Sequence, residues 1–486
     1  MYLGIDLGTS GVKTILMDDD QKVLASKSAR LSVSRPQPGW SEQSAEDWWT
    51  ATQQTLDALA ADHPGQMTSV KGIGLSGQMH GATLLDKEGS VLRPCILWND
   101  GRATVEGKEL EAAEPALRAI SGNVAMPGFT APKVAWVRKH EPENYDRIAK
   151  VLLPKDYLRY KLTGEYVAEM SDASGTLWLD VAARDWSEGL LDASGLTRDH
   201  MPSLVEGSAP SGNLREDLAK RWGMASPPVV AGGGGDNAAS ACGVGTITPG
   251  SAFVSLGTSG VLFASNERFS PNTANAVHAM CHAIPNTWHQ MGVILSATDC
   301  LEWLAGITGT PAAELSAKVT AEGLRPTTVQ FMPYLGGERT PHSNSNIRAG
   351  FAGLAHETDA AVLTQVVFEG VAFAFRDSLE ALKEAGTDIS RATAVGGGSR
   401  SHAWLTIIAN ALNIDIDIPA DGDFGAALGA ARLGICAATG AAPTEVCAPP
   451  PMAKTISPTA DLAAAYQESY EKYCKLGRAV ITAMEW

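Results

Sequence analysis

The chain has 486 residues, a hydrophobic fraction of 44% and a formal net charge of −16 at pH 7. This length exceeds the size at which single hydrophobic cores stop growing, so we expect two domains, and the composition excludes a disordered chain. The negative charge disfavours binding to nucleic acid or to an anionic membrane surface, although backbone amides and a bound cation can still hold an anionic nucleotide.

The N-terminus predicts a β-hairpin over residues 2–17, in which two apolar runs flank the turn DLGTSG. Glycines let a ligand approach the backbone, so the turn amides and the hydroxyls of Thr9 and Ser10 are suited to hold phosphate. Asp6 faces the same phosphates and needs a cation between them, which predicts Mg²⁺ bound through water. For one copy alone, an ordinary hairpin turn is an equally good interpretation.

A helix over 46–59 and a strand over 73–75 come next, and two polar segments follow the strand. GLSGQMHG (74–81) sets polar side chains among glycines, and LWNDGR (97–102) adds more, with an indole as an apolar wall. Closely set donors and acceptors are typical of a pocket for a hydroxyl-rich ligand. The side chains concerned are Gln78, His80, Trp98, Asn99, Asp100 and Arg102. A histidine with a purely structural role is an equal alternative for His80.

A strand over 229–231 leads into the glycine-rich segment GGGGDN (232–237). Because four glycines leave room for a ligand, Asp236 is a candidate general base for a substrate hydroxyl. A helix N-cap is the other interpretation of Asp236, and the two are compatible.

A second hairpin is predicted over 252–264, and its hexapeptide LGTSGV (256–261) is identical to residues 7–12. Two chance copies are improbable, so we infer duplication of a strand-turn-strand unit and a domain boundary near residue 245, giving domains 1–245 and 246–486. Ser255 takes the place of Asp6 in the second copy, so only the first half is expected to hold the metal.

In the second half, a strand over 392–395 ends at three glycines that open a helix over 402–410. Such a position is where α/β sheets bind nucleotides, although a plain turn explains one glycine triplet as well. We also predict helices over 363–382 and 461–484 and a tightly packed helix within Phe424–Ala442. Strands alternating with helices indicate an α/β fold. Glu338 and Arg339 in GERTPH receive no role.

The seven cysteines are scattered and form no CxxC pair, which predicts reduced thiols and a cytoplasmic location. No basic region precedes Asp6, so we expect no signal peptide. The absence of HExxH and CxxC spacing makes a transition-metal site unexpected.

The ordered motifs resemble the FGGY family of carbohydrate kinases through nearly the whole chain. They are DLGTSGVK, GLSGQMHG, LWNDGR, GGGGDN, SLGTSGV, GERTPH, GFAGL with FEGVAFAFRD, and VGGGSRS. Two of them, QMHG and LWNDGR, are similar to the members that phosphorylate D-xylulose rather than to glycerol kinases or ribulokinases.

The resemblance implies two actin-like (ribonuclease H-like) α/β domains flanking a central cleft, and ATP-dependent phosphorylation of D-xylulose to D-xylulose 5-phosphate. It implies Asp236 as the general base, and Asp6 as a second catalytic residue that organises Mg²⁺ and ATP. The implied sugar-binding residues are Met79, His80 and Asn237, with Gln78, Trp98 and Asp100 beside them. The implied ATP-binding residues are Thr9, Ser10, Gly11, Lys13, Thr258, Gly397 and Gly398. A homodimer is also consistent with the family.

Two alternatives are open. A kinase for another pentulose or polyol, such as ribulose, xylitol or glycerol, is distinguished by kcat/KM values across those sugars. An actin-like ATPase that acts as a chaperone or filament subunit would hydrolyse ATP slowly whatever sugar is present.

Overall fold

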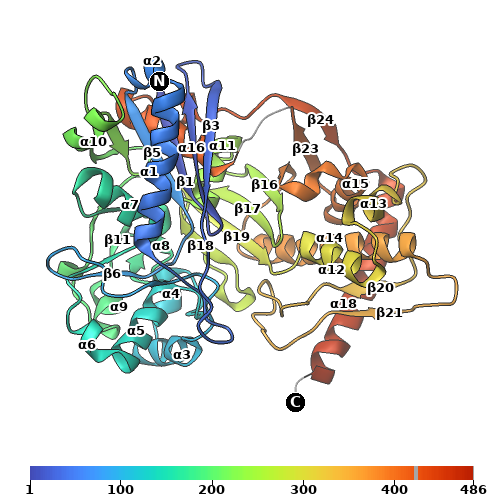
Figure 1. Ribbon diagram of the computed structural model, residues 1–486. Coiled ribbons are helices and arrows are strands. Elements are labelled where there is room, and N and C mark those ends of the chain that lie inside the picture. Colours follow the sequence, from blue (N-terminus) through green and yellow to red (C-terminus); the bar gives the residue numbers. More distant parts are fainter. Residues whose placement is uncertain (421–424, 485–486) are drawn as a thin grey trace.

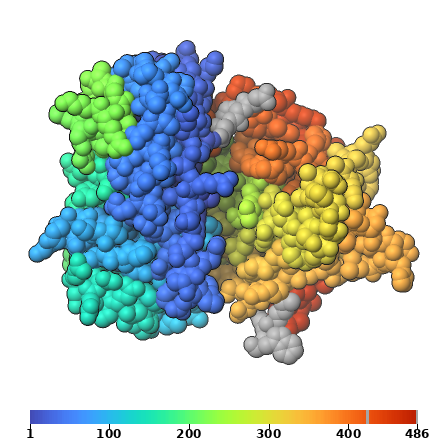
Figure 2. Space-filling view, in the orientation of Figure 1, coloured from blue at the N-terminus to red at the C-terminus, as the bar shows by residue number. Residues whose placement is uncertain are grey.

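A computed structural model describes residues 1–420 and 425–484, which form two lobes side by side (Figure 1). The first lobe contains the N-terminal half of the chain, and the second contains most of the C-terminal half. Figure 2 shows the surface hollowed between them, with residues from the middle of the chain at the floor.

The first lobe is built on a sheet with the strand order β13-β14-β5-β1-β2-β3, in which β15 also pairs with β5. The strands are β1 (Tyr2–Leu7), β2 (Gly11–Met17), β3 (Val23–Arg30), β5 (Gly72–Gly77), β13 (Pro210–Asn213), β14 (Val229–Ala231) and β15 (Gly234–Gly235). The hairpin β1–β2 is antiparallel, whereas β1, β5 and β15 run parallel. Since β1 and β5 are covered on both faces, they consist of small and apolar residues, apart from Asp6 near the end of β1.

The second sheet has the order β18-β19-β17-β16-β22-β23-β24. The strands are β16 (Ala252–Leu256), β17 (Gly260–Asn266), β18 (His278–Cys281), β19 (Trp288–Ile294), β22 (Arg391–Val395), β23 (Asp415–Pro419) and β24 (Met452–Ile456). Its hairpin β16–β17 continues into the parallel strands β22 and β23, as β1–β2 continues into β5 and β14. Both predicted hairpins are therefore confirmed, and the repeat extends to four strands of each sheet.

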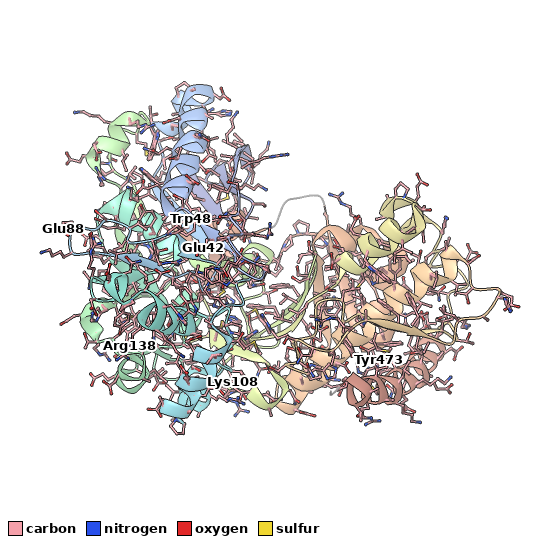
Figure 3. The ribbon with its side chains drawn as sticks, turned by 60° about the horizontal axis from the view of Figure 1, so that its bottom comes forward. Glu42, Trp48, Glu88, Lys108, Arg138 and Tyr473 are labelled. Carbon is pink, nitrogen blue, oxygen red and sulfur yellow. The ribbon has the colours of Figure 1, made fainter. Side chains whose placement is uncertain are left out.

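Helices cover both sheets, as the α/β pattern predicted. In the first lobe α1 (Ala45–Asp62) packs against β2 and β3. In the second, α14 (Ala360–Glu384) packs against β17 and β19, and α15 (His402–Leu412) packs against α14. The C-terminal helix α18 (Ala460–Met484) packs against α14 and α15, and its Tyr473 hydroxyl lies 2.9 Å from that of Tyr334 (Figure 3).

One helix of the C-terminal half crosses back to the first lobe. Figure 1 shows α16 (Ala426–Thr439) beside β1 and β5, and it also packs against α11 (Asp236–Val244). The approach is so close that a β-carbon on Gly74 would lie 1.7 Å from the carbonyl oxygen of Ala430. The predicted tightly packed helix is thus confirmed for its described part, while Phe424 lies outside the described residues.

Shorter elements complete the described chain. The strands are β4 (Glu42–Gln43), β6 (Thr83–Leu85), β7 (Cys95–Ile96), β8 (Lys150–Leu152), β9 (Val167–Glu169), β10 (Leu179–Asp180), β11 (Asp185–Trp186), β12 (Ser203–Val205), β20 (Gln330–Met332) and β21 (Gly350–Ala352). The α-helices are α2 (Pro64–Met67), α3 (Thr104–Ala113), α4 (Leu117–Ser121), α5 (Thr130–His140), α6 (Pro142–Tyr145), α7 (Pro154–Thr163), α8 (Met170–Ser174), α9 (Glu188–Ala193), α10 (Glu216–Arg221), α12 (Thr298–Thr308), α13 (Ala312–Ala317) and α17 (Pro443–Val446). The 3-10 helices are η1 (Arg198–His200), η2 (Thr273–Asn275) and η3 (Gly397–Arg400). Among the described helices, none combines the length and apolar character needed to cross a membrane.

Candidate active site

Two cavities meet between the lobes, and Ser255 of β16 lines both of them. The smaller, of about 270 Å³, is lined from the first lobe by Met79, His80 and Trp98 and by the pair Asp236 and Asn237. The larger, of about 820 Å³, lies over the glycines that follow β22. We refer to them as the inner cavity and the outer cavity. The structure therefore brings four of the predicted sugar-binding residues and the predicted base, Asp236, to one cavity.

Asp236 is the first residue of α11 and follows β15, whose Gly234 pairs with Ser76 of β5. Gly235 occupies the N-cap and makes no side-chain cap, so Asp236 is one residue beyond the position that the N-cap interpretation gives it. Its Oδ1 accepts hydrogen bonds from the backbone N and Nδ2 of Asn237, at 2.7 and 2.9 Å. Its Oδ2 has no hydrogen-bond donor among the described residues, so that oxygen is available to a substrate.

The electrostatic surroundings of Asp236 suit a base. Burial, reinforced by the nearby carboxylate of Asp6, raises its pKa to about 6, against the opposing hydrogen bonds from Asn237. A carboxylate with this pKa binds a proton more strongly than an ordinary aspartate, yet is largely ionised at neutral pH.

Asp6 lies near the end of β1, opposite Lys13 on β2 and beside Ser76 on β5. Burial raises its pKa, while the nearby Ser76 side chain and the charge of Lys13 act in the opposite direction. The carboxylates of Asp6 in β1 and Asp236 at the start of α11 repel each other, and a divalent cation bound between them and a phosphate would offset this repulsion. The described residues contain no cluster of three ligating side chains, so phosphate and water would have to complete such a cation's coordination.

A chain of hydrogen bonds stabilises the turn between β1 and β2. The Thr9 hydroxyl donates to Oε1 of Gln78 (2.9 Å) and accepts from Nε1 of Trp98 (3.0 Å). Gln43 accepts from Gln78 at 2.9 Å and donates to the Thr9 carbonyl at 2.7 Å. The turn closes through a bond from Gly8 N to Gly11 O (2.9 Å). Gln78 thus lies behind the turn and outside the residues that line the inner cavity.

Asp100 is also placed behind the cavity rather than in its wall. Its carboxylate forms a buried ion pair with Arg102 (2.7 Å) and accepts from the backbone N of Ser41 (2.6 Å). These contacts fix the LWNDGR segment, which leaves Trp98 as the residue of that segment that reaches the cavity.

His80 combines a structural bond with a position in the cavity wall. Its Nδ1 lies 2.8 Å from the carbonyl oxygen of Gly175, and burial lowers its pKa to about 3. The ring is therefore neutral with the proton on Nδ1, so Nε2 can only accept a hydrogen bond. Its φ of +69° is uncommon for a side chain of this size. Thr130 and Lys133 hold this backbone by donating to the His80 carbonyl, both at 3.0 Å.

The second turn and the outer cavity place the remaining predicted residues. Gly257 and Ser259 line the inner cavity, whereas Thr258 lies between them and is exposed. Gly397 lines the outer cavity. Gly398 instead packs against β16, because a β-carbon there would lie 2.8 Å from that of Leu256.

The residues of the inner cavity wall that received no role from the sequence patterns include Phe129, His278 and Arg339. The ring of Phe129 lies between those of His80 and His278, at centroid distances of 4.6 and 5.6 Å. His278 stands in an ordinary strand without a motif, so only the fold identifies it.

A fully buried ionic cluster, also missed, holds the glycine segment before Asp236. Arg159 donates to the carbonyl of Gly232 and pairs with Asp156 (2.9 Å). Ser171 Oγ accepts from the backbone N of Gly235 at 3.1 Å. The cluster comprises Lys155, Asp156, Arg159, Glu169 and Asp172. Arg159 of this cluster and the neighbouring Ser171 therefore fix the two ends of the glycine segment 232–235.

Comparison with known proteins identifies the family. Residues 1–243 match the N-terminal domain, and residues 252–438 the C-terminal domain, of the FGGY family of carbohydrate kinases. The chain belongs to this family. It is 49% identical to the xylulose kinase of Escherichia coli (strain K12), with both chains covered over 100% of their length.

Solved structures agree with this FGGY assignment. A crystal structure from Brucella ovis, described as a xyloylose kinase, has a TM-score of 0.97 at 56% identity, with 99% of each chain covered. The xylulose kinase of Rhodospirillum rubrum has a TM-score of 0.90 at 26% identity, with 100% of each chain covered. The expected α/β fold of the actin-like sugar kinases is thus confirmed.

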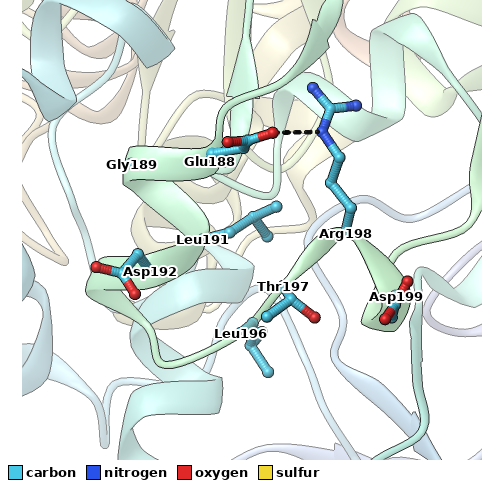
Figure 4. A pocket seen from close by; sticks show the side chains of 8 residues that line it. All are labelled: Glu188, Gly189, Leu191, Asp192, Leu196, Thr197, Arg198 and Asp199. Atoms are coloured by element: carbon cyan, nitrogen blue, oxygen red, sulfur yellow. Dashed lines mark ion pairs between the residues drawn. The ribbon is translucent and has the colours of Figure 1, made fainter.

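A further hollow of about 550 Å³ lies on the outer surface between α9 and η1, away from these cavities (Figure 4). Its one cation, among the residues drawn, is Arg198, which pairs with Glu188 within the hollow at 3.4 Å. Because the guanidinium of Arg198 also pairs with Asp185 at 2.8 Å, this hollow presents no unpaired charge of Arg198 to a ligand.

Proposed function

We propose that this FGGY kinase transfers the γ-phosphoryl group of ATP to the terminal hydroxyl of D-xylulose, giving D-xylulose 5-phosphate and ADP. The observation that carries the proposal is the position of Asp236, in the inner cavity and next to the phosphate-binding turn at Asp6. The 49% identity to the Escherichia coli xylulose kinase supports D-xylulose as the acceptor.

In the proposed reaction, the sugar occupies the inner cavity and its terminal hydroxyl donates to Oδ2 of Asp236. As the hydroxyl oxygen attacks the γ-phosphorus, its proton passes to that carboxylate, and ADP leaves on the opposite side. Asn237 holds Oδ1 of Asp236 and so directs Oδ2 toward the substrate. His80 Nε2 accepts a hydrogen bond from another sugar hydroxyl. Because the His80 ring is neutral, it adds no positive charge that would compete with the substrate for the Asp236 carboxylate.

The outer cavity is the proposed site of the nucleotide, with Gly397 in its wall. The turns at Thr9 and Ser259 are the proposed phosphate contacts, since Ser259 lines the inner cavity and Thr9 is hydrogen-bonded to Trp98 in the same wall. Asp6 is the proposed anchor of Mg²⁺ through water. When bound, Mg²⁺ would neutralise charge on the transferred phosphoryl group. A cytoplasmic location and a homodimer also remain proposals, the former supported by seven cysteines that are all free thiols.

A coupled assay of ADP release over a sugar panel tests the function. We expect release to depend strongly on D-xylulose, with kcat/KM values for ribulose, xylitol and glycerol at least about 10-fold lower, since the buried polar groups would lose partners. A higher kcat/KM for another sugar would reassign the acceptor. ATP hydrolysis that no sugar accelerates would support the non-kinase ATPase instead.

The pH dependence follows from the two carboxylates. Asp236 must be ionised to accept a proton, so kcat/KM for the sugar is expected to fall as the pH drops through about 6. Because the Asp6 carboxylate raises the pKa of Asp236, Asp6→Asn should move this acid limb to lower pH while reducing the rate. An acid limb that stays in place, or moves to higher pH, would contradict the assignment of that limb to Asp236.

A further inference from the structure

Arg339 is a cation in the inner cavity for which the proposed reaction supplies no role. It follows β20 in the GERTP segment and lines the same cavity as Asp236 and His80. No described carboxylate forms an ion pair with its guanidinium. The neighbouring carboxyl of Glu338 accepts instead from the backbone N of Leu295 and of Arg339, at 2.9 and 2.8 Å.

A chain of hydrogen bonds holds one end of this guanidinium. Asn123 Nδ2 donates to the carbonyls of Ser121 (2.8 Å) and Ala279 (3.2 Å), which fixes the amide so that Oδ1 faces His278. Oδ1 lies 2.7 Å from Nδ1 of His278, so that nitrogen carries the proton and Nε2 is an acceptor. Nη1 of Arg339 lies 3.4 Å from this Nε2. The Nε and Nη2 groups have no acceptor among the described residues.

Arg339 lies toward the end of the cavity formed by His80, Phe129 and His278. Its Nη1 lies 3.4 Å from His278, whose ring is followed by those of Phe129 and His80 at successive centroid distances of 5.6 and 4.6 Å. Its charge accordingly lowers the pKa of both histidines, whereas the charge that raises the pKa of Asp236 is that of Asp6. A sugar whose terminal hydroxyl reaches Asp236 therefore extends its opposite end toward Arg339. In a 2-ketose phosphorylated at the last carbon, that opposite end is the C1 hydroxyl and the C2 carbonyl.

We propose that Arg339 is a specificity-determining residue that recognises the α-hydroxyketone end of the sugar through its Nε and Nη2 groups. This inference rests on the proposed function. The planar guanidinium of Arg339 can only donate hydrogen bonds, whereas a carbonyl oxygen can only accept them. Its Nε and Nη2 groups therefore match the carbonyl oxygen together with the adjacent hydroxyl oxygen. In the corresponding alditol, xylitol, the carbonyl is replaced by a hydroxyl whose own proton needs an acceptor that Arg339 lacks.

The test compares Arg339→Gln with the wild type on a ketose and its alditol. We expect kcat/KM for D-xylulose to fall about 10- to 100-fold, the loss typical of hydrogen bonds to a charged group. The inhibition constant of xylitol should change by less than about three-fold. The variant is therefore expected to discriminate less than the wild type between D-xylulose and xylitol. Arg325→Gln is the matched control, because Arg325 is exposed and its Nη1 bonds only to the Leu324 carbonyl; both constants should stay unchanged.

Equal losses for D-xylulose and xylitol, or no loss for either, would overturn the proposal. If Arg339→Gln does not fold, Arg339→Lys keeps the charge without the fork and should narrow the same preference. The kcat/KM values of the wild type across the sugar panel distinguish a failure of the proposed function from a failure of the role proposed for Arg339. A wild type that prefers another ketose reassigns only the substrate, and Arg339 is then tested with that ketose and its alditol. A wild type that prefers a polyol refutes both.

Discussion

Replacing Asp236 by Asn is expected to lower kcat about 10²- to 10⁴-fold, the usual contribution of a general base. Asparagine keeps the size of the side chain and can still contact the sugar, but it cannot take the proton from the hydroxyl. The KM for D-xylulose should therefore change little, and the acid limb near pH 6 should disappear with the carboxylate. Steady-state kinetics and a pH profile of the purified variant measure both effects.

Asp192→Asn is the control for this experiment. Asp192 is an exposed residue of α9 in the outer-surface hollow, so its loss removes one carboxylate without touching either cavity. Its kcat and pH profile should match those of the wild type. If Asp236→Asn kept sugar-dependent turnover within a few-fold of the wild type, Asp236 would not be the base. Transfer would then depend mainly on positioning and on charge stabilisation.

Much of the fold could be predicted because its signals are local in sequence. The identical hexapeptides at 7–12 and 256–261 predicted two hairpins, and each hairpin was found within a larger repeated sheet. The return of α16 to the first lobe could not be predicted in this way. Its partners, such as Gly4, Gly72 and Gly74, lie more than 350 residues away along the chain, and a glycine in a strand can equally mark a bulge or a tight bend.

In the candidate site, too, local sequence patterns identified some residues, whereas others are brought together only by the fold. Asp6, Asp236 and His80 stand beside glycines at strand ends, and that local pattern predicted a ligand site. His278 and Phe129 have no such neighbours, and the fold alone brings the ring of Phe129 between those of His80 and His278. Gln78 and Asp100 carry the right functional groups in the right segments, but their side chains turn inward to Thr9 and Arg102. Side-chain direction was therefore the part that sequence patterns left open.

The close packing of α16 on α11 leads to the largest expected effect on stability. A β-carbon on Gly429 of α16 would lie 1.7 Å from the carbonyl oxygen of Ala239, which belongs to the backbone of α11 and cannot rotate away. Gly429→Ala should therefore cost about 3 kcal/mol or more, at the upper end of overpacking effects. Because α11 begins at Asp236, forcing the helices apart should also lower kcat. Thermal unfolding and kinetics on the same preparation measure the two losses.

Gly306→Ala is the matched control, because it makes the same substitution inside α12 where no neighbour lies within 4 Å of the added carbon. Alanine is favoured over glycine in a helix by about 0.5–1 kcal/mol, so this variant should be slightly more stable than the wild type and equally active. Because Gly429→Ala should lower the stability and Gly306→Ala should raise it, the comparison distinguishes the effect of packing from that of helix propensity. A Gly429→Ala variant as stable as the wild type would mean that α16 can move away from α11 without loss, and that the position of Asp236 does not depend on this contact.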